Sequence, residues 1–347
     1  MAGSLYSEVA SRLLNESLRV KKGETITVET WNSGLPIARE VVKLARRIGC
    51  IPIMIFEDEN TYVDGVRKTP RKVLGQMGKH EYGLLAASDA YVFIPGPPLG
   101  SYYKRITREE YSKATRYNDA WYAAAEKAHL RGVRLSFGYI GKDLAGYLGK
   151  SVRDVATAQL RASLADFKRV RSKGVKVLER LQDGASVAIK SEGGELRFRL
   201  KGETELEDGV VDAADRASGQ NMTYLPPGFV SKEVERTSAR GKIKLSPSLT
   251  RLGIAEDLTL EFDNGRLTNW SSGKPTRMVD EILKSVEESN RALSLLTIGL
   301  NDKLGFGLGL DRFVEGSIAI SGFGFVGILR RGTLAVDGSP IVARGEV

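Results

Sequence analysis

The stretch GSIAISGFGFVGILRRGTLAVDG, residues 316–338, decides which fold the C-terminal half adopts. Its segment GFGFVG, from Gly322 to Gly327, has the GxGxxG spacing of a dinucleotide-binding loop. Such a loop binds phosphates only where it follows a strand and opens a helix. Here the surrounding residues are typical of strands, and VDG at 336–338 is a strong hairpin signal. The stretch therefore predicts two strands and a hairpin, in which the glycines allow close packing of strands and bind no dinucleotide.

The rest of the C-terminal half has the same character. Gly193-Gly194 and DNG at 263–265 mark two further hairpins. Helical spacing of apolar residues interrupts the strands at MVDEILKSVEESNRALSLL, residues 278–296. We therefore expect residues 181–347 to form an α+β domain in which antiparallel strands predominate.

The N-terminal half shows a strand–helix–strand pattern. ETITVET (24–30) predicts a strand, residues 33–50 an amphipathic helix, and IPIMIFE (51–57) a second strand. Short apolar strands of this kind are typical of parallel sheets that helices cover on both faces. Residues 151–180 predict one long helix that links the two halves. The expected fold is therefore α/β, with a Rossmann-like domain over residues 1–180.

Composition indicates a cytoplasmic globular protein. The chain has 347 residues, of which 41% are hydrophobic and 27% charged, and no apolar run is long enough for a membrane span. The N-terminus lacks the basic region of a signal peptide. The single cysteine, Cys50, excludes an intramolecular disulfide. Four glutamines, two histidines and abundant charges are typical of thermophile proteins.

Positive charge is concentrated in the first half. Residues 1–180 hold 31 basic and 19 acidic residues, whereas residues 181–347 hold 21 and 24. Such an asymmetry predicts a polyanionic partner, either RNA or a ribosomal subunit, although a Lys- and Arg-rich thermophile surface gives the same pattern. No RNA-binding module is recognisable, so phosphate contacts are expected. The candidate contacts are Lys104, Arg105, Arg108, Lys168, Arg169, Arg171 and Lys173, with Arg330 and Arg331 as a control pair.

Several motifs resemble the thermophilic metalloaminopeptidase family of aminopeptidases T and S. Their order and spacing match that family over most of the chain, starting with the first helix and strand. The motifs are LLNESLRVKKGETITVET (13–30), LPPGFV (225–230) with GKIKL (241–245), LTLEFDNGRLTNWSS (258–272), LTIGLN (296–301) and GSIAIS (316–321) with RRGTLAVDG (330–338).

The resemblance implies a two-metal hydrolase that removes N-terminal residues from peptides, with Glu, His and Asp ligands in the C-terminal half. The positions that match those ligands hold Phe229, Leu295, Ala319, Gly322 and Gly324. Both histidines of the chain lie in the first half. The resemblance therefore implies a catalytically inactive relative that uses no metal cofactor and works by binding.

Two alternatives stay open at this point. Asp302, Asp311 and Glu315 lie close in sequence and could form an oxygen-ligand site, or they could be ordinary loop carboxylates. An active metalloaminopeptidase with relocated ligands is thus one alternative, and a protein that binds a peptide or small molecule in the old substrate cavity is another. The resemblance also implies a possible homodimer and no membrane partner.

Overall fold

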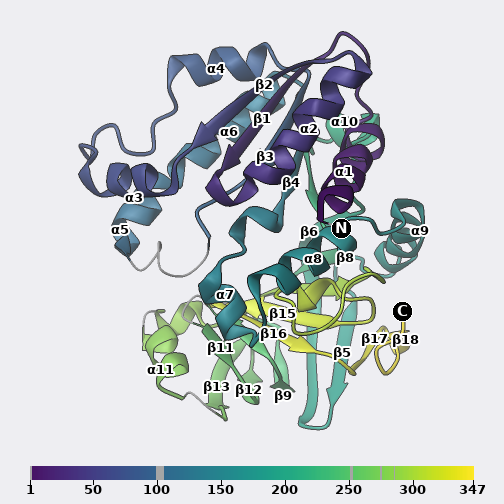
Figure 1. Ribbon diagram of the computed structural model, residues 1–347. Helices are drawn as coiled ribbons and strands as arrows, with labels where there is room; N and C mark the ends of the chain where they lie inside the picture. Colours follow the sequence, from purple (N-terminus) through teal and green to yellow (C-terminus); the bar gives the residue numbers. More distant parts are fainter. Residues whose placement is uncertain (1, 99–104, 251–252, 274–275, 285) are drawn as a thin grey trace. The chain divides into compact units, whose positions relative to one another are not determined.

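A computed structural model describes residues 2–98, 105–250, 253–273, 276–284 and 286–347. The chain forms two compact units (Figure 1). Unit 1 comprises residues 1–164 and 209–226, and unit 2 comprises residues 165–208 and 227–347. The sequence-based division at residue 180 therefore differs from the division in the structure, because residues 165–180 belong to unit 2 and residues 209–226 return to unit 1.

Unit 1 is built on a parallel sheet in the order β2-β1-β3-β4-β7. Helix α2 packs against β1 and β2, while α4 and α6 pack against each other beside Tyr91 and Trp121. The strands are β1 (Thr25–Trp31), β2 (Ile51–Glu57), β3 (Ala90–Ile94), β4 (Arg131–Leu135) and β7 (Met222–Leu225). The helices are α1 (Ala2–Arg12), α2 (Leu35–Ile48), α3 (Glu59–Lys68), α4 (Lys79–Ala86), α5 (Arg108–Ala114), α6 (Arg116–Lys127), α7 (Lys142–Tyr147), α8 (Val152–Ala162) and α10 (Ala213–Ala217).

The predicted single linking helix over residues 151–180 is wrong, because two helices lie there. Helix α8 ends at Ala162, and α9 runs over Phe167–Leu178. The side chain of Asp166 accepts hydrogen bonds from the main-chain N–H groups of Lys168 and Arg169, which starts the second helix. The division between the two units falls in this break.

Unit 2 is mainly antiparallel, as the sequence predicts. Its strands follow the order β11-β10-β16-β15-β14-β8-β6-β5-β17-β18, with β9 joining β6 to the β12–β13 hairpin. The first group of strands is β5 (Ser186–Ser191), β6 (Gly194–Glu207), β8 (Phe229–Val234), β9 (Arg240–Leu245), β10 (Ser248–Thr250) and β11 (Gly253–Ala255). The second is β12 (Leu258–Asp263), β13 (Arg266–Ser271), β14 (Leu293–Gly299), β15 (Ile318–Gly322), β16 (Phe325–Leu329), β17 (Thr333–Val336) and β18 (Ser339–Val342), with α11 at Thr276–Lys284.

The GFGFVG segment forms an antiparallel hairpin, as expected, and opens no helix. Strands β15 and β16 pair directly, with Gly322 opposite Phe325. The turn residues Phe323 and Gly324 both have positive φ, at 31° and 94°, which suits a two-residue hairpin turn. The predicted DNG and VDG hairpins are also confirmed, as β12–β13 and β17–β18.

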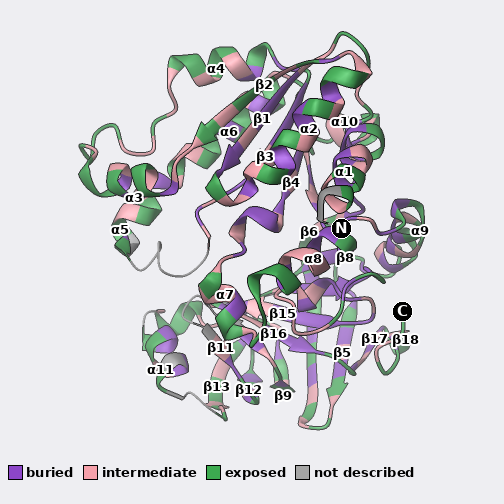
Figure 2. Ribbon diagram, viewed as in Figure 1, coloured by how far each residue is buried: buried purple, intermediate pink, exposed green. Residues whose placement is uncertain are grey.

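One apolar core holds unit 2 together. Buried side chains of α9, including Val170 and Val177, join Val230, Leu296 and Ile318 from the central strands in this core. Figure 2 shows buried residues along the strands of unit 2. Helix α9 packs on β6 and β8, so Gly174 lies against Leu206. Within the described residues no helix has the length and apolar composition of a membrane span.

Candidate functional site

Three of the positions that match metal ligands lie on one face of adjacent strands. Strands β8, β14 and β15 are neighbours, and Thr297 of β14 pairs with Ser231 on one side and Ala319 on the other. Side chains alternate along each strand, so Phe229 and Leu295 lie on this same face. The residues that alternate with them and point to the other face of the sheet, such as Val230, Leu296 and Ile318, form the core of unit 2. Phe229, Leu295 and Ala319 therefore share a surface, which we call the central face.

The other two matched positions lie elsewhere. Gly322 is the last residue of β15 and has the opposite parity to Ala319, and Gly324 occupies the hairpin turn. A Cβ on Gly322 would come within 2.4 Å of the main-chain oxygen of Ala292, so close strand packing requires glycine there. The predicted packing role thus fits Gly322.

Aromatic rings and one guanidinium occupy the central face near Phe229. The ring of Phe229 stacks on that of Phe313, with centroids 4.6 Å apart and 11° between the planes. The guanidinium of Arg312 lies over the Phe313 ring, 4.7 Å from its centroid. Burial lowers the pKa of Arg312, although the charge of Glu205 opposes this effect. These groups do not fit a metal centre, which needs several carboxylates or imidazoles directed at one point.

The three carboxylates considered as replacement ligands are each engaged by other groups. Asp302 and Glu315 both pair with Arg169, and Asp311 accepts hydrogen bonds from the N–H groups of Gly307 and Leu308. Arg330 also reaches Asp311, at 3.3 Å. Across the described part of the chain, no group of three or more His, Cys, Asp or Glu side chains is arranged to hold a metal ion.

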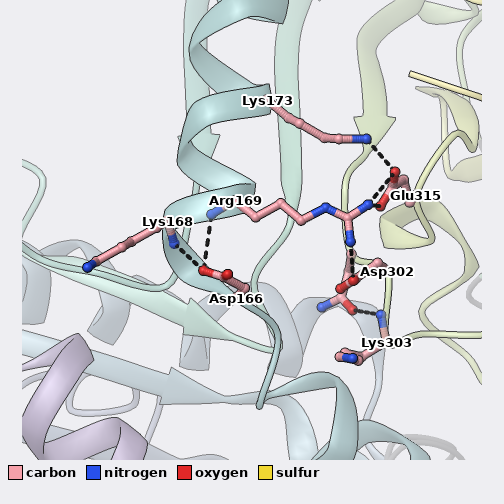
Figure 3. Close-up of polar contacts among 8 residues, drawn as sticks. Asp166, Lys168, Arg169, Lys173, Asp302, Lys303 and Glu315 are labelled. Atoms are coloured by element: carbon pink, nitrogen blue, oxygen red, sulfur yellow. Dashed lines mark hydrogen bonds and ion pairs between the residues drawn. The ribbon is translucent and has the colours of Figure 1, made fainter.

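Ion pairs neutralise much of the basic surface of α9 (Figure 3). The guanidinium of Arg169 lies between Asp302 and Glu315, and the ammonium of Lys173 also binds Glu315. Arg171 pairs with Asp208, whose carboxylate is buried. The three predicted RNA contacts Arg169, Arg171 and Lys173 therefore form ion pairs with carboxylates of unit 2. Their partners lie far away in the sequence, so neighbouring residues gave no sign that these three charges are paired.

The remaining predicted contacts divide between the two units. The side chain of Lys168 is exposed and points away from the ion pairs of Arg169 (Figure 3). Arg105 is exposed in unit 1 and donates to the side chain of Asn60 at 3.3 Å, and Arg108 is the first residue of α5. Lys104 lies outside the described residues.

Assigning α9 to unit 2 changes the distribution of charge. Unit 1 holds 26 basic and 19 acidic residues, a net charge of +7. Unit 2 holds 26 and 24, a net charge of +2. The difference between the two compact units is thus smaller than the difference between the two halves of the sequence.

A polar cluster in unit 1 was missed by the sequence analysis. Tyr91 donates a hydrogen bond to Glu29 on the neighbouring strand, and Tyr117 donates one to Glu81. Burial raises the pKa of Glu29 to about 7, against the lowering effect of the Tyr91 hydrogen bond. The signal in the sequence was a glutamate inside the apolar strand ITVETW, at residues 26–31.

An arginine stands on the same face of the sheet as this cluster. Glu29 pairs in register with Phe93, which pairs with Arg134 of β4. The guanidinium of Arg134 lies 5.5 Å from the ring centroid of Phe93 and 5.4 Å from that of Tyr139. These residues stand toward the carboxyl ends of parallel strands, where α/β sheets bind ligands.

No protein-family model matches the chain, and no curated protein matches it at the level of sequence. The solved structures that share its fold include the following two. Wild-type AmpT from Thermus thermophilus has a TM-score of 0.66 and 15% identity, covering 99% of this chain and 98% of its own. The 2,5-dihydroxypyridine dioxygenase of Pseudomonas putida KT2440 has a TM-score of 0.65 and 14% identity, covering 100% and 98%.

These neighbours carry out different reactions, so the likeness establishes the fold alone. The α/β class with a parallel sheet and a mainly antiparallel sheet, expected from the sequence, is confirmed by the structure and by these neighbours. The chain has the fold of aminopeptidase T.

Proposed function

We propose that the protein is a binding factor that lacks metallopeptidase activity. The observation that carries this proposal is the chemistry of the central face. A two-metal hydrolase needs oxygen or nitrogen ligands at such positions. This chain has the apolar side chains of Phe229, Leu295 and Ala319 there. The Phe229–Phe313 stack fills part of that surface with aromatic carbon.

Metal content and peptidase activity test this proposal together. The purified chain is expected to hold less than one equivalent of zinc, cobalt or manganese by elemental analysis. It is also expected to leave a panel of unblocked dipeptides and tripeptides intact when cobalt or zinc is added. Two tightly bound metal ions per chain, or turnover that a chelator abolishes, would support the active aminopeptidase instead.

We further propose that the partner is RNA, and that α9 contacts its phosphates in the cytoplasm. The helix carries five cations and no acidic residue between Phe167 and Leu178. No carboxylate of the described residues pairs with Lys168, Lys176 or Arg180, and all three side chains are exposed. We therefore assign the contacts to these three residues and not to Arg169, Arg171 and Lys173.

Charge reversal on α9 tests the RNA proposal. The variant Lys168→Glu with Lys176→Glu is expected to weaken co-sedimentation with ribosomal subunits. Its salt dependence should also be shallower, by about one unit of slope for each phosphate that the variant no longer binds. Because Arg330 binds the buried Asp311, a better control for charge is Lys242→Glu with Arg266→Glu, two exposed sites on β9 and β13.

The outcomes separate the candidates. Loss of binding in the α9 variant alone supports an RNA contact on that helix. Equal loss in both variants means that net charge alone drives association. If the wild type fails to sediment at low salt, the basic surface has no RNA partner, and a peptide or small-molecule ligand becomes the better candidate.

A further inference from the structure

One row of side chains crosses the parallel sheet of unit 1 and stays partly open to solvent. The residues that pair in register along this row are Ile55 of β2, Glu29 of β1, Phe93 of β3, Arg134 of β4 and Tyr224 of β7. All five are half-buried, although a parallel sheet normally has both faces covered. Two residues before Phe93, on the same face, Tyr91 is buried against Trp121 of α6. The helices therefore cover this face up to Tyr91 and leave the next row accessible to a ligand.

The strand order places this row at a topological switch point. Strand β2 lies on one side of β1, and the chain then crosses over to form β3 on the other side. In open α/β sheets, ligands bind outside the carboxyl ends of the strands at such a point. Glu29 and Phe93 stand toward the carboxyl ends of β1 and β3, the two strands that flank the switch point. The open row thus lies where a sheet of this topology binds small molecules.

Arg134 in this row has no carboxylate partner. Its guanidinium donates a hydrogen bond to the hydroxyl of Tyr139, and no carboxylate of the described residues pairs with it. The rings of Phe93, Tyr139 and Tyr224 surround it, with centroids 5.5, 5.4 and 6.0 Å away. Cations that are withdrawn from water are normally paired with an anion, and a guanidinium holds a carboxylate through two parallel hydrogen bonds. Arg134 therefore has the surroundings of an anchor for the carboxylate of a ligand.

Glu29 offers a hydrogen-bond acceptor at the other end of the row. Tyr91 donates to its Oε2 atom, and none of the described residues donates to its Oε1 atom. Phe93 stands between Glu29 and Arg134 in register, so their main chains are two strand spacings apart, about 10 Å. The two side chains do not pair with each other. A ligand that reaches both needs an anion at one end and a hydrogen-bond donor at the other.

We propose that unit 1 binds a small aromatic carboxylate that carries a hydrogen-bond donor opposite its carboxyl group. The carboxylate pairs with Arg134, the ring lies against Phe93, and the donor binds Oε1 of Glu29. An aromatic ring suits this position, because rings pack well on other rings and lose little conformational freedom on binding. Every residue of this site belongs to unit 1, whereas the central face and α9 belong to unit 2.

A series of ligands tests which chemical groups the site recognises. The probe is para-aminobenzoate, which has the carboxylate, the flat ring and the donor. Benzoate lacks the donor, cyclohexanecarboxylate lacks the flat ring, and inorganic phosphate is an anion alone. Isothermal titration calorimetry of the full chain should show affinity falling in that order, with benzoate about tenfold weaker than para-aminobenzoate. Phosphate should show no binding.

Two variants assign the ends of the ligand. Arg134→Gln should weaken binding of both benzoates by about 10- to 100-fold, because it removes a charge-assisted pair. Glu29→Leu with Tyr91→Phe removes the carboxyl group and its donor together, so no buried hydroxyl is left unpaired. This double variant should bind benzoate like the wild type and lose the preference for para-aminobenzoate. Arg116→Gln is the matched control for charge, since Arg116 is exposed on α6. Circular dichroism checks the fold of each variant.

Three results would overturn the proposal. The first is a folded wild type that does not bind para-aminobenzoate at millimolar concentrations. The second is unchanged affinity in folded Arg134→Gln. The third is phosphate binding as tight as that of para-aminobenzoate, which would mark a general anion site without recognition of a ring. None of these results depends on RNA binding by α9 or on the metal content of the purified chain.

Discussion

Phe229, the first residue of β8, and Phe313 stack in parallel, with ring centroids 4.6 Å apart. Offset or stacked aromatic pairs contribute about 0.5–1.5 kcal/mol beyond the area that they bury. A side chain at this position therefore stabilises unit 2 through its ring.

A double-mutant cycle measures that contribution. We expect Phe229→Ala and Phe313→Ala each to lower the free energy of unfolding. The double variant should lose less than the sum, by about 0.5–1.5 kcal/mol. Equilibrium unfolding in urea gives the four values. A coupling energy within about 0.3 kcal/mol of zero would show that the two rings do not interact.

Placing one imidazole on the central face should not create a metal site. Ala319 is fully buried, and its strand β15 pairs with β14 on one side and with β16 on the other. Ala319→His is expected to destabilise the protein by about 1–3 kcal/mol, because it buries a polar group without a partner. It should yield no peptidase activity with added cobalt or zinc. Ala319→Leu is the control for stability, because it adds volume to the site without adding a polar group. Peptide hydrolysis by Ala319→His would mean that further metal ligands are present.

Glu29 should make stability depend on pH. Its pKa is raised from 4.5 to about 7 in the folded protein, so the folded state binds more protons than the unfolded state between these values. The free energy of unfolding therefore falls as pH rises from about 4.5 to about 7. Glu29→Gln removes this decline and should be more stable than the wild type at pH 8, by at most about 3 kcal/mol.

Chemical unfolding at pH 5 and pH 8 tests the sign of this effect. Tyr91→Phe provides a second variant, since the Tyr91 hydrogen bond lowers the pKa of Glu29. Its decline in stability should move to higher pH. Parallel pH profiles for the wild type and Glu29→Gln would show that the glutamate is ionised at neutral pH.

A pair of glycines separates backbone strain from steric conflict. Gly228 has φ of 111°, and a Cβ there would lie 2.8 Å from the main-chain nitrogen of Asn301. Gly338 has φ of 80° and open space around it. We expect Gly338→Ala to cost about 1 kcal/mol and Gly228→Ala about 2–4 kcal/mol in unfolding free energy. Similar losses of unfolding free energy in the two variants would mean that the chain at Gly228 and the loop at Asn301 move apart easily to admit the added Cβ.

Local signals in the sequence predicted local structure well. The helix that ends at Gly49 has a left-handed glycine there, and the DNG and VDG tripeptides form hairpin turns. The signal in each case is the residue that the turn requires, so a few neighbouring positions suffice. The alternation of apolar strands and helices predicted the parallel sheet of unit 1 for the same reason.

Long-range pairing could not be predicted in this way. Arg169 and Glu315 are 146 residues apart in the chain, and nothing in either neighbourhood indicates the other. Charge counting along the sequence therefore overestimated the free charge of α9. The Tyr91 hydrogen bond to Glu29 was missed for the same reason, because it depends on the order of strands in the sheet.

The return of residues 209–226 to unit 1 bears on how the protein is made. Strand β7 completes the parallel sheet beside β4, yet the ribosome synthesises α9, β5 and β6 of unit 2 before it. A nascent chain that ends at residue 164 thus presents β4 as an open edge. The N-terminal unit therefore cannot complete its sheet until residue 226 has been synthesised, when α9, β5 and β6 of unit 2 have already been made. The interval in which β4 stays open is set by the time needed to synthesise residues 165–226.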